Sequence, residues 1–365
     1  MPIPVAPLKQ AELPVREKPL LKMMGPGIVM AGLAIGSGEL IMWPWITSVV
    51  GSQLLWAAAI GIFLQLWINI EVGRWAIVTG ESPFTGMVRV IKLLVYVFVF
   101  MIIVGKFLPG WARETGVALR DLIFGPNHTS PEWLWTAVVF AIIAVILFGP
   151  KVIYTAVERC IMVLIVIIVL GLIYVVWEIG SKELFLEMWR GVSNVFQFPK
   201  FPVDILADDG SVRDQLTFSR FFGAVVFAGA GGLGNLYYAY YLREKRIGMG
   251  ARMPTLMSAV HKHEVKEMDT GYVYPDTEEN HRHFRDWFRF VVIDQVLFFW
   301  ILGSFTMFLF IFGALAVLHP IGLVPDKSSL VWDLASILEA SMGTSGRYIF
   351  LIVGMSALFS TQLGG

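Results

Sequence analysis

The feature that most restricts the fold is a series of long apolar segments, many of them about as long as a bilayer is thick. They cover residues 24–50, 53–79, 90–117, 132–148, 152–178, 218–242, 289–318 and 347–365. A transmembrane helix needs about 20 mainly apolar residues. With 56% hydrophobic and 15% charged residues, the composition is typical of a polytopic helical membrane protein and not of a soluble domain. We therefore expect an all-α, multi-pass integral membrane protein, surrounded by a lipid bilayer and without a nucleic-acid partner.

Two of these segments match each other, and glycine interrupts both. Residues 27–40 and 223–236 lie 196 positions apart, align without a gap and share six residues. Such glycine spacing also serves close packing of helices. A matched pair of glycine-broken apolar segments, however, is typical of the binding site of a transporter built from two repeats. We therefore predict inverted repeats, with helices one and six unwound near 36–39 and 231–235 and facing each other at mid-membrane.

The repeat pattern divides the chain into four parts. Residues 1–22 form a flexible tail, 23–178 a first five-helix repeat, 179–217 a connection, and 218–365 a second repeat of three helices with a loop at 243–288. The distribution of Lys and Arg favours a cytoplasmic N-terminus, with the loop also inside and the connection outside. The second repeat has only three of the five expected helices, and the sequence ends within an apolar run. We interpret this repeat as truncated.

The strongest single candidate is Glu39, the only ionisable residue of the first glycine-rich segment. A carboxylate near the bilayer centre costs on the order of 3 kcal/mol and is usually kept for a pathway or a partner. An ion pair with a lysine or arginine is the structural alternative. Asn235 stands opposite Glu39 in the second segment, and unwound backbone adds free carbonyl groups that suit a cation. We predict that Glu39 and Asn235 bind a metal ion, and that Ser37, Gly36 and Gly232 complete the substrate site.

Three other carboxylates lie in or at the edges of apolar segments, namely Glu114, Glu158 and Asp294. Each is a candidate for a proton pathway, and each lies close enough to a predicted boundary to be an interfacial anchor instead. Glu71 and Arg74 are three residues apart on a predicted helix, a spacing that favours a simple ion pair on one helix face.

No pattern in the sequence indicates an enzyme or a cofactor. The run Gly229–Gly234 fits a dinucleotide-binding fingerprint but lacks the strand that must precede it. A single cysteine, Cys160, excludes a disulfide framework. The polar loop holds several possible metal ligands, and a solvated loop is favoured over a metal sensor there. These residues are His261, His263, Glu264, His281 and His283.

Several motifs resemble those of the Nramp (natural resistance-associated macrophage protein) family of divalent-metal transporters, over nearly the whole chain from Gly25. Gly36-Ser37-Gly38-Glu39 occupies the place of the family's Asp-Pro-Gly-Asn, and Gly232-Leu233-Gly234-Asn235-Leu236-Tyr237 that of its Met-Pro-His-Asn-Leu-Tyr. The other similar stretches are Gly25-Pro26-Gly27, Arg74-Trp75-Ala76-Ile77-Val78-Thr79-Gly80, Glu158, Ile293-Asp294 and Phe359-Ser360-Thr361. The resemblance implies a LeuT-type inverted-repeat fold and secondary transport of a divalent metal, with possible proton coupling.

The sequence also departs from the family at the expected site. The family's metal-binding aspartate is replaced by Gly36, its asparagine by Glu39, its methionine by Gly232 and its histidine by Gly234. The side chains that remain offer oxygen, which suits hard cations better than soft transition metals. We therefore predict a secondary active transporter of a cation, favouring magnesium or manganese, that works by alternating access. A carrier of a small organic solute is the alternative within transport, and a non-transporting sensor or scaffold is the alternative outside it.

Overall fold

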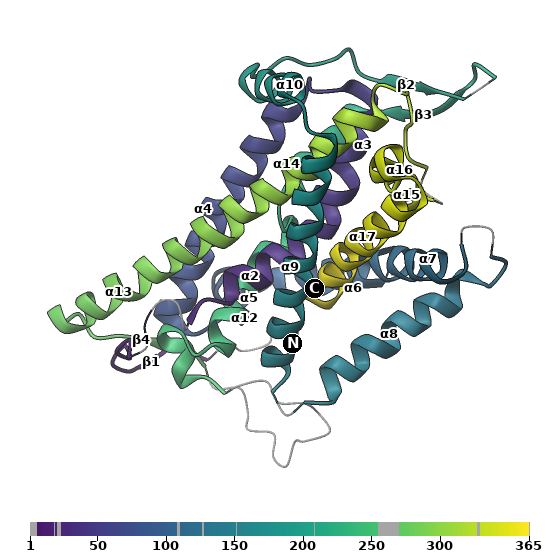
Figure 1. Ribbon diagram of the computed structural model, residues 1–365. Helices are drawn as coiled ribbons and strands as arrows, with labels where there is room; N and C mark the ends of the chain where they lie inside the picture. Colours follow the sequence, from purple (N-terminus) through teal and green to yellow (C-terminus); the bar gives the residue numbers. More distant parts are fainter. Residues whose placement is uncertain are drawn as a thin grey trace.

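The computed structural model describes residues 6–17, 19, 23–107, 110–125, 128–150, 152–207, 209–254, 270–326 and 329–364, and it is mainly helical (Figure 1). The α-helices are α2 (Pro26–Ala34), α3 (Trp43–Val50), α4 (Leu55–Thr79), α5 (Pro83–Val90), α6 (Leu94–Phe107), α7 (Gly110–Phe124), α8 (Glu132–Phe148), α9 (Ile153–Ile179), α10 (Lys182–Ser193), α11 (Phe218–Val226), α12 (Tyr238–Glu244), α13 (Glu278–Asp294), α14 (Gly303–Gly313), α15 (Leu330–Leu334), α16 (Ser336–Met342) and α17 (Thr344–Gly364). Three segments are π-helical, η1 (Ile35–Met42), η5 (Gln295–Leu302) and η6 (Ala314–Leu318), and two are 3-10 helical, η2 (Gly232–Tyr237) and η3 (Gly248–Arg252). The strands are β1 (Lys9–Gln10), β2 (Val203–Leu206), β3 (Val212–Leu216) and β4 (Tyr272–Val273).

Within the described residues, four helical stretches are long and apolar enough to cross a membrane. They are Pro26–Val50, Leu55–Thr79, Ile153–Ile179 and Glu278–Leu318. The all-α, polytopic fold class is therefore confirmed. Two short two-stranded sheets add to it: β1 pairs with β4 in parallel, and β2 pairs with β3 in an antiparallel hairpin.

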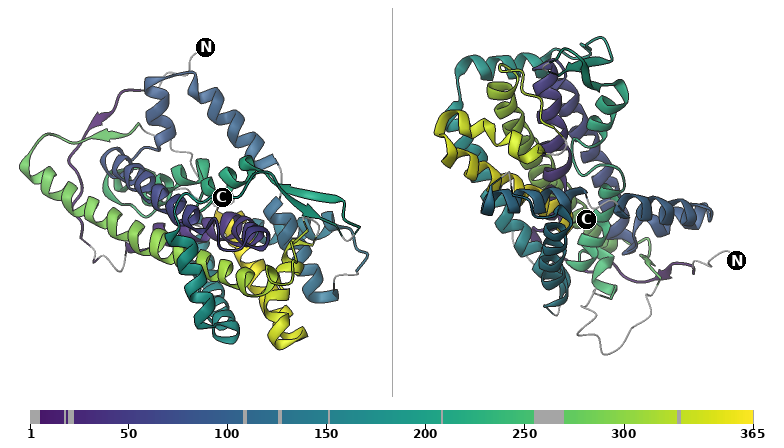
Figure 2. Two further views of the ribbon diagram at one scale, coloured as in Figure 1. Left: turned by 90° about the horizontal axis from the view of Figure 1, so that it is seen from above. Right: turned by 90° about the vertical axis from the view of Figure 1, so that its right-hand side faces the viewer.

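The third apolar segment differs from its prediction as one helix over 90–117. The structure divides it into α6 and α7, with Pro109 and Gly110 in the sequence at the junction. Proline has no amide hydrogen and disfavours a continuing helix, so the sequence itself favours a boundary at this point. In Figure 2, α6 projects from the rest of the molecule, and most of its large apolar side chains are exposed.

The seventh segment also differs, because its helix begins at Glu278 instead of residue 289. The side chain of Thr277 accepts a hydrogen bond from the backbone N–H of Asn280, and Glu278 and Glu279 follow in the first turn. Capping and early acidic residues stabilise a helix start even where the sequence is polar. The added turns are amphipathic, so a search for apolar runs does not detect them.

The first glycine-rich segment remains helical throughout, which corrects the predicted unwinding at residues 36–39. It continues from α2 through η1 into α3, and η1 holds Gly36, Gly38 and Glu39. The interruption is therefore a change from α-helical to π-helical hydrogen bonding. Segments of this kind are frequent at functional sites.

The second glycine-rich segment is interrupted, but its non-helical residues are 227–231 instead of the predicted 231–235, because residues 232–237 are 3-10 helical. Helix α11 ends at Val226, the chain is not helical over 227–231, and η2 then leads into α12. Gly231 and Gly232 have φ angles of 67° and 50°. Residues with a Cβ atom rarely adopt such values, so glycine is required at this point. We refer to residues 227–231 as the helix-6 break.

Helices α4 and α13–η5–α14 run side by side in opposite directions. At one end, a Cβ atom on Gly73 would lie 2.5 Å from the Val291 side chain, and at the other a Cβ atom on Gly303 would lie 3.1 Å from the Ile62 side chain. Figure 1 shows the β1–β4 pair near one end of the molecule and α10 with the β2–β3 hairpin at the opposite end. Residues 6–17 and the described parts of 243–288 thus share one end, and the 179–217 connection lies at the other.

The described part of the N-terminal tail is docked, although the sequence predicts a flexible segment. The side chain of Leu13 is buried, and its backbone N–H donates to Asn280 Oδ1 at 3.0 Å. Trp287 donates its ring N–H to the carbonyl of Pro14 at 2.7 Å. Asn280 and Trp287 both lie on the polar turns of α13, which the sequence analysis assigned to the loop at 243–288. The tail finds hydrogen-bonding partners because those turns are helical.

Candidate functional site

The two interrupted helices meet each other at their interruptions. A Cβ atom on Gly38 would lie 1.5 Å from the carbonyl oxygen of Phe227. A Cβ atom on Gly61, in α4, would lie 2.6 Å from the carbonyl oxygen of Val225. Real Cβ atoms do not approach backbone oxygens so closely, so only glycine permits these contacts. The π-helical segment η1 and the helix-6 break are therefore in direct backbone contact, as the matched glycines predict.

Gln65, in the middle of α4, satisfies polar groups at the helix-6 break and on either side of it. Its amide N–H donates to the carbonyl of Val226 at 2.9 Å. Its Oε1 accepts from the backbone N–H of Gly231 at 3.0 Å and from the Asn235 side chain at 3.2 Å. Unpaired backbone groups inside a bilayer are costly, so Gln65 helps to stabilise the break, together with local backbone hydrogen bonds such as Phe227 N–H to Gly223 and Gly234 N–H to Gly231.

Glu39 is fully buried and is turned toward α14. Its Oε2 accepts a hydrogen bond from the Thr306 hydroxyl at 2.6 Å, and its Oε1 has no hydrogen-bond partner among the described residues. A Cβ atom on Gly303 would lie 3.4 Å from that free oxygen, so glycine leaves room beside it. No lysine or arginine of the described chain pairs with Glu39, so the ion pair considered from the sequence is not found there.

Helix α17 holds η1 from the other side. The backbone N–H of Gly36 donates to Thr361 Oγ1 at 2.8 Å, and the Ser360 hydroxyl donates to the carbonyl of Gly32 at 2.9 Å. A change to π-helical bonding leaves backbone groups without their usual partners, and side chains from a neighbouring helix replace them. The Phe359-Ser360-Thr361 stretch thus has a direct structural role beside Glu39.

The predicted substrate residues all lie near these contacts, but no contact between described atoms joins Glu39 to Asn235. Asn235 is buried and faces Gln65, and its own Oδ1 has no partner among the described residues. Gly36 contributes backbone only, and a Cβ atom on Gly232 would meet nothing within 4 Å. The side chain of Ser37 lies outside the described part of the structure. Binding of one ion by both Glu39 and Asn235 therefore requires each to turn from its present partner.

Asp294 and Glu158 flank the start of α2. Asp294 is fully buried and accepts a hydrogen bond from the Tyr238 hydroxyl at 2.8 Å. A Cβ atom on Gly27 would lie 2.8 Å from the Asp294 carboxylate, and one on Gly25 would lie 2.0 Å from Glu158. The positive end of a helix favours nearby carboxylates, so both acids stabilise this helix start.

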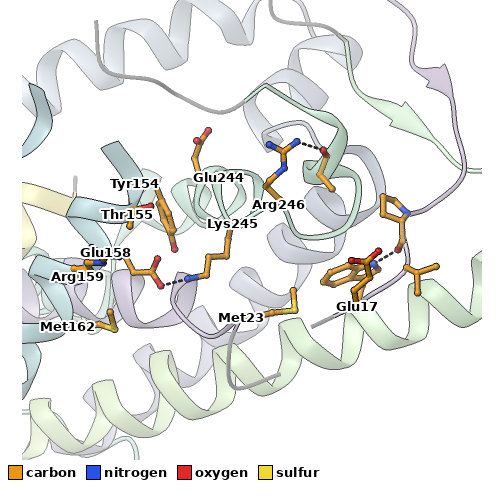
Figure 3. Close-up of a pocket in the computed structure, with 14 residues that line it drawn as sticks. Glu17, Met23, Tyr154, Thr155, Glu158, Arg159, Met162, Glu244, Lys245 and Arg246 are labelled. Atoms are coloured by element: carbon orange, nitrogen blue, oxygen red, sulfur yellow. Dashed lines mark hydrogen bonds and ion pairs between the residues drawn. The ribbon is translucent and has the colours of Figure 1, made fainter. Parts of the chain in front are cut away.

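Glu158 also lines a polar cavity of about 580 Å³, drawn in Figure 3. It forms an ion pair with Lys245, and Glu17, Arg159, Glu244 and Arg246 are other charged residues around the cavity. Pro14 and Val15 of the N-terminal tail contribute to the same wall. The cavity therefore begins beside the start of α2 and is covered partly by the tail.

Glu114 lies apart from the other two candidates for a proton pathway. It pairs with Arg113, which also binds Glu132 of α8 at 2.7 Å. No contact in the described chain links this group to Glu158 or Asp294. The ion pair between Glu71 and Arg74 is formed and exposed, as the spacing predicts.

The loop histidines do not form a metal site in the part that the structure describes. His281 pairs with Asp276 at 2.6 Å, and His283 contacts the carbonyl of Leu13 at 3.0 Å. His261, His263 and Glu264 lie outside the described residues. Among the described residues, no group of three His, Cys, Asp or Glu side chains could hold a metal ion.

Gln65 and Thr306 are functional candidates that the sequence analysis missed. A glutamine within an apolar helix is a signal in itself, because buried polar side chains in membranes are costly. Gln65 could have been selected on that basis. Thr306 gives no such signal, because threonine is common in transmembrane helices and its role depends on Glu39, far away in the sequence.

Comparisons with known proteins support the fold but do not assign a family. No family model matches the sequence, and no curated protein is detectably similar to it. Among solved structures, the Eremococcus coleocola manganese transporter, in complex with an aromatic bis-isothiourea substituted compound, superposes with a TM-score of 0.56 at 15% identity. That match covers 94% of this chain and 63% of the transporter, so the chain spans less than two thirds of its length.

A second kind of transporter matches nearly as well. MhsT in complex with L-phenylalanine gives a TM-score of 0.51 at 14% identity, over 96% of this chain and 72% of MhsT. Identities this low support a similar backbone arrangement only. They do not indicate the substrate or the mechanism of this chain. The chain has the LeuT-type helical fold that these transporters share.

Proposed function

We propose that this protein is a secondary transporter that carries a cation across the membrane by alternating access, with Glu39 as the charged ligand. The observation that carries the proposal is the free Oε1 of Glu39, buried beside the contact between η1 and the helix-6 break. A buried carboxylate oxygen without a partner is costly, and a cation compensates it. An interrupted helix pair at mid-membrane is where carriers of this architecture bind substrate.

The ligands near Glu39 favour a hard divalent cation, magnesium or manganese. Asn235 offers a free amide oxygen, and the helix-6 break offers backbone carbonyl groups. All of these are oxygen ligands, and hard cations prefer them. Magnesium keeps several of its waters in protein sites, so one carboxylate and a few neutral oxygens suffice while the site is open to water.

Proton coupling is a further part of this proposal. Asp294 and Glu158 lie on either side of the start of α2, at the end of the helix that would have to move to open the site. Protonation of either acid would weaken its interaction with that helix start. Glu114 is a separate candidate, since its contacts are with Arg113 and not with this helix.

Titration calorimetry on the purified protein tests the role of Glu39. We expect magnesium and manganese to bind, cadmium to bind more weakly, and Glu39→Gln to reduce magnesium and manganese affinity at least tenfold because it removes the charge. Glu71→Gln is the matched control, because Glu71 is an exposed carboxylate paired with Arg74, and it should bind as the wild type does. Tight cadmium binding that survives Glu39→Gln would contradict the ligand assignment.

Flux measurements separate the other candidates. Uptake of manganese into proteoliposomes is expected for a carrier, whereas binding without flux favours a sensor and the absence of both favours a scaffold. An organic solute has support from the open space at Gly232 and from MhsT, whose structure contains L-phenylalanine. Binding of an amino acid, with no response to any of the three metals, would favour that alternative.

A further inference from the structure

A second group of buried polar side chains lies where α4 passes η5, away from Glu39. Gly73 of α4 packs against Val291 and against the ring of Tyr238. Asn69 is one turn from Gly73, and Gln295 is one turn from Val291. Because the two helices are antiparallel neighbours, this spacing places Asn69 and Gln295 at the same level of the helix pair.

The amide group of Asn69 has no hydrogen-bond partner among the described residues, and the amide group of Gln295 lies beside Tyr238 and Asp294. Both side chains are fully buried, and none of their four amide atoms makes a hydrogen bond of good geometry to a described residue. Buried polar groups in proteins nearly always have a partner, so a group of unsatisfied ones requires an explanation. A ligand bound between the two helices supplies one.

Asp294, the residue before Gln295, adds a negative charge at the same place. Its Oδ2 accepts from Tyr238 at 2.8 Å, while its Oδ1 has no hydrogen-bond partner and no lysine, arginine or histidine of the described chain pairs with it. The backbone N–H groups of Gly25 and Gly27 and the Gln295 side chain also lie beside this carboxylate, and a cation or a proton at Oδ1 would neutralise the charge that remains buried.

We propose that Asp294, Gln295 and Asn69 form a sodium site distinct from the substrate site at Glu39. Asp294 Oδ1, Gln295 Oε1 and Asn69 Oδ1 are its ligands, and Tyr238 orients the carboxylate through its other oxygen. The single negative charge balances one monovalent cation, and neutral amide oxygens complete a shell suited to a hard ion. A divalent ion is disfavoured because this closed position would leave one positive charge uncompensated.

The position of this site gives the ion a mechanical role. The Asp294 carboxylate also packs against Gly27 at the start of α2. An ion at Oδ1 therefore links α13 and η5, through Asp294 and Gln295, to α4, through Asn69, directly beside the first residues of α2. Sodium binding should stabilise the arrangement in which the start of α2 is held between these helices.

Unfolding temperature, followed by tryptophan fluorescence of the purified protein in detergent, tests the sodium site. Sodium chloride is exchanged for choline chloride at constant ionic strength and fixed pH. We expect a saturable rise in unfolding temperature with sodium, a smaller effect of potassium, and loss of the response in Asp294→Asn. Asn69→Leu should weaken the apparent sodium affinity at least tenfold. Because leucine suits a membrane interior, this variant also tests the site if Asp294→Asn does not fold.

Two controls separate this site from the rest of the protein. Asp286→Asn removes an exposed carboxylate from the same helix and should leave the sodium response unchanged. Glu39→Gln should also keep it, so failure of the proposed substrate site and failure of the sodium site are distinguishable.

Three results would overturn the sodium site. One is an unfolding temperature independent of sodium in the wild type, and another is a sodium response that persists in both Asp294→Asn and Asn69→Leu. The third is a response to manganese or to pH, but not to sodium, that disappears in Asp294→Asn, because the occupant would then be a divalent ion or a proton.

Discussion

At the scale of single residues, the centre of this protein depends on side chains that satisfy polar groups exposed by interrupted helices. Gln65 serves the helix-6 break, and Thr361 serves η1. Thr306 fixes one oxygen of Glu39 and leaves the other free. Each of these contacts joins residues more than 100 positions apart, so their roles follow from tertiary packing.

The effect of Gln65→Leu tests how strongly one residue supports the break. The substitution removes the partners of Val226 and Gly231 and of the Asn235 side chain. Each buried polar group left unsatisfied costs about 1–3 kcal/mol. We therefore expect the unfolding temperature in detergent to fall by several degrees. Gln53→Leu, in the partly exposed turn before α4, is the matched control, and an equal loss in both variants would show that Gln65 has no special role.

At the scale of elements, the sequence predicted the meeting of two interrupted helices but not the form of the first interruption. Matched glycines reveal where backbones approach closely, because a Cβ atom at Gly38 cannot fit against Phe227. They do not reveal whether the backbone unwinds or changes to π-helical bonding. That depends on whether a neighbour such as Thr361 can accept the freed N–H of Gly36. The extra turns of α13 were missed for a related reason, since capping at Thr277, and not hydrophobicity, starts that helix.

Paired glycine substitutions test the contact between the two helices. A Cβ atom on Gly38 would lie 1.5 Å from the Phe227 carbonyl oxygen, whereas one on Gly234 would make ordinary contacts at 3.5 Å. Because Gly38→Ala forces the two backbones apart, we expect a large loss of folded protein on size-exclusion chromatography. Gly234→Ala, in the corresponding position of the other segment, should be tolerated. Equal tolerance of both would mean that the two interruptions are not in contact.

At the scale of the whole molecule, the polar features lie along one direction, from Glu39 and the helix-6 break, past Asn69 and Asp294, to the polar cavity at Glu158. The matched segments predicted the first of these places, and the isolated acids indicated the others one by one. Their arrangement could not be predicted, because it depends on the antiparallel register of α4 with η5 and on where the start of α2 is held. The docking of residues 6–17 could not be predicted either. A proline-rich tail is expected to be flexible unless its partners on α13 are known.

The docked tail should control access to the polar cavity. Pro14, Val15 and Glu17 line one wall, and the tail is fixed by the buried Leu13 and by hydrogen bonds from Trp287 and to Asn280. Deletion of residues 1–17 removes that wall, so groups deeper in the cavity should become more accessible. A cysteine at position 162, where Met162 lines the cavity, provides a reporter once the native thiol is removed by Cys160→Ser.

We expect a thiol reagent to label Met162→Cys severalfold faster in the deletion variant than in the full chain. The double variant Asn280→Ala, Trp287→Phe should show an intermediate rate, because it keeps the tail but removes three of its hydrogen bonds. Leu186→Cys on α10 lies at the opposite end of the molecule and reports on general loosening, so its rate should not change. If all labelling rates are the same with and without the tail, the tail does not cover the cavity in solution, and access to Glu158 and the start of α2 is set by the helices alone.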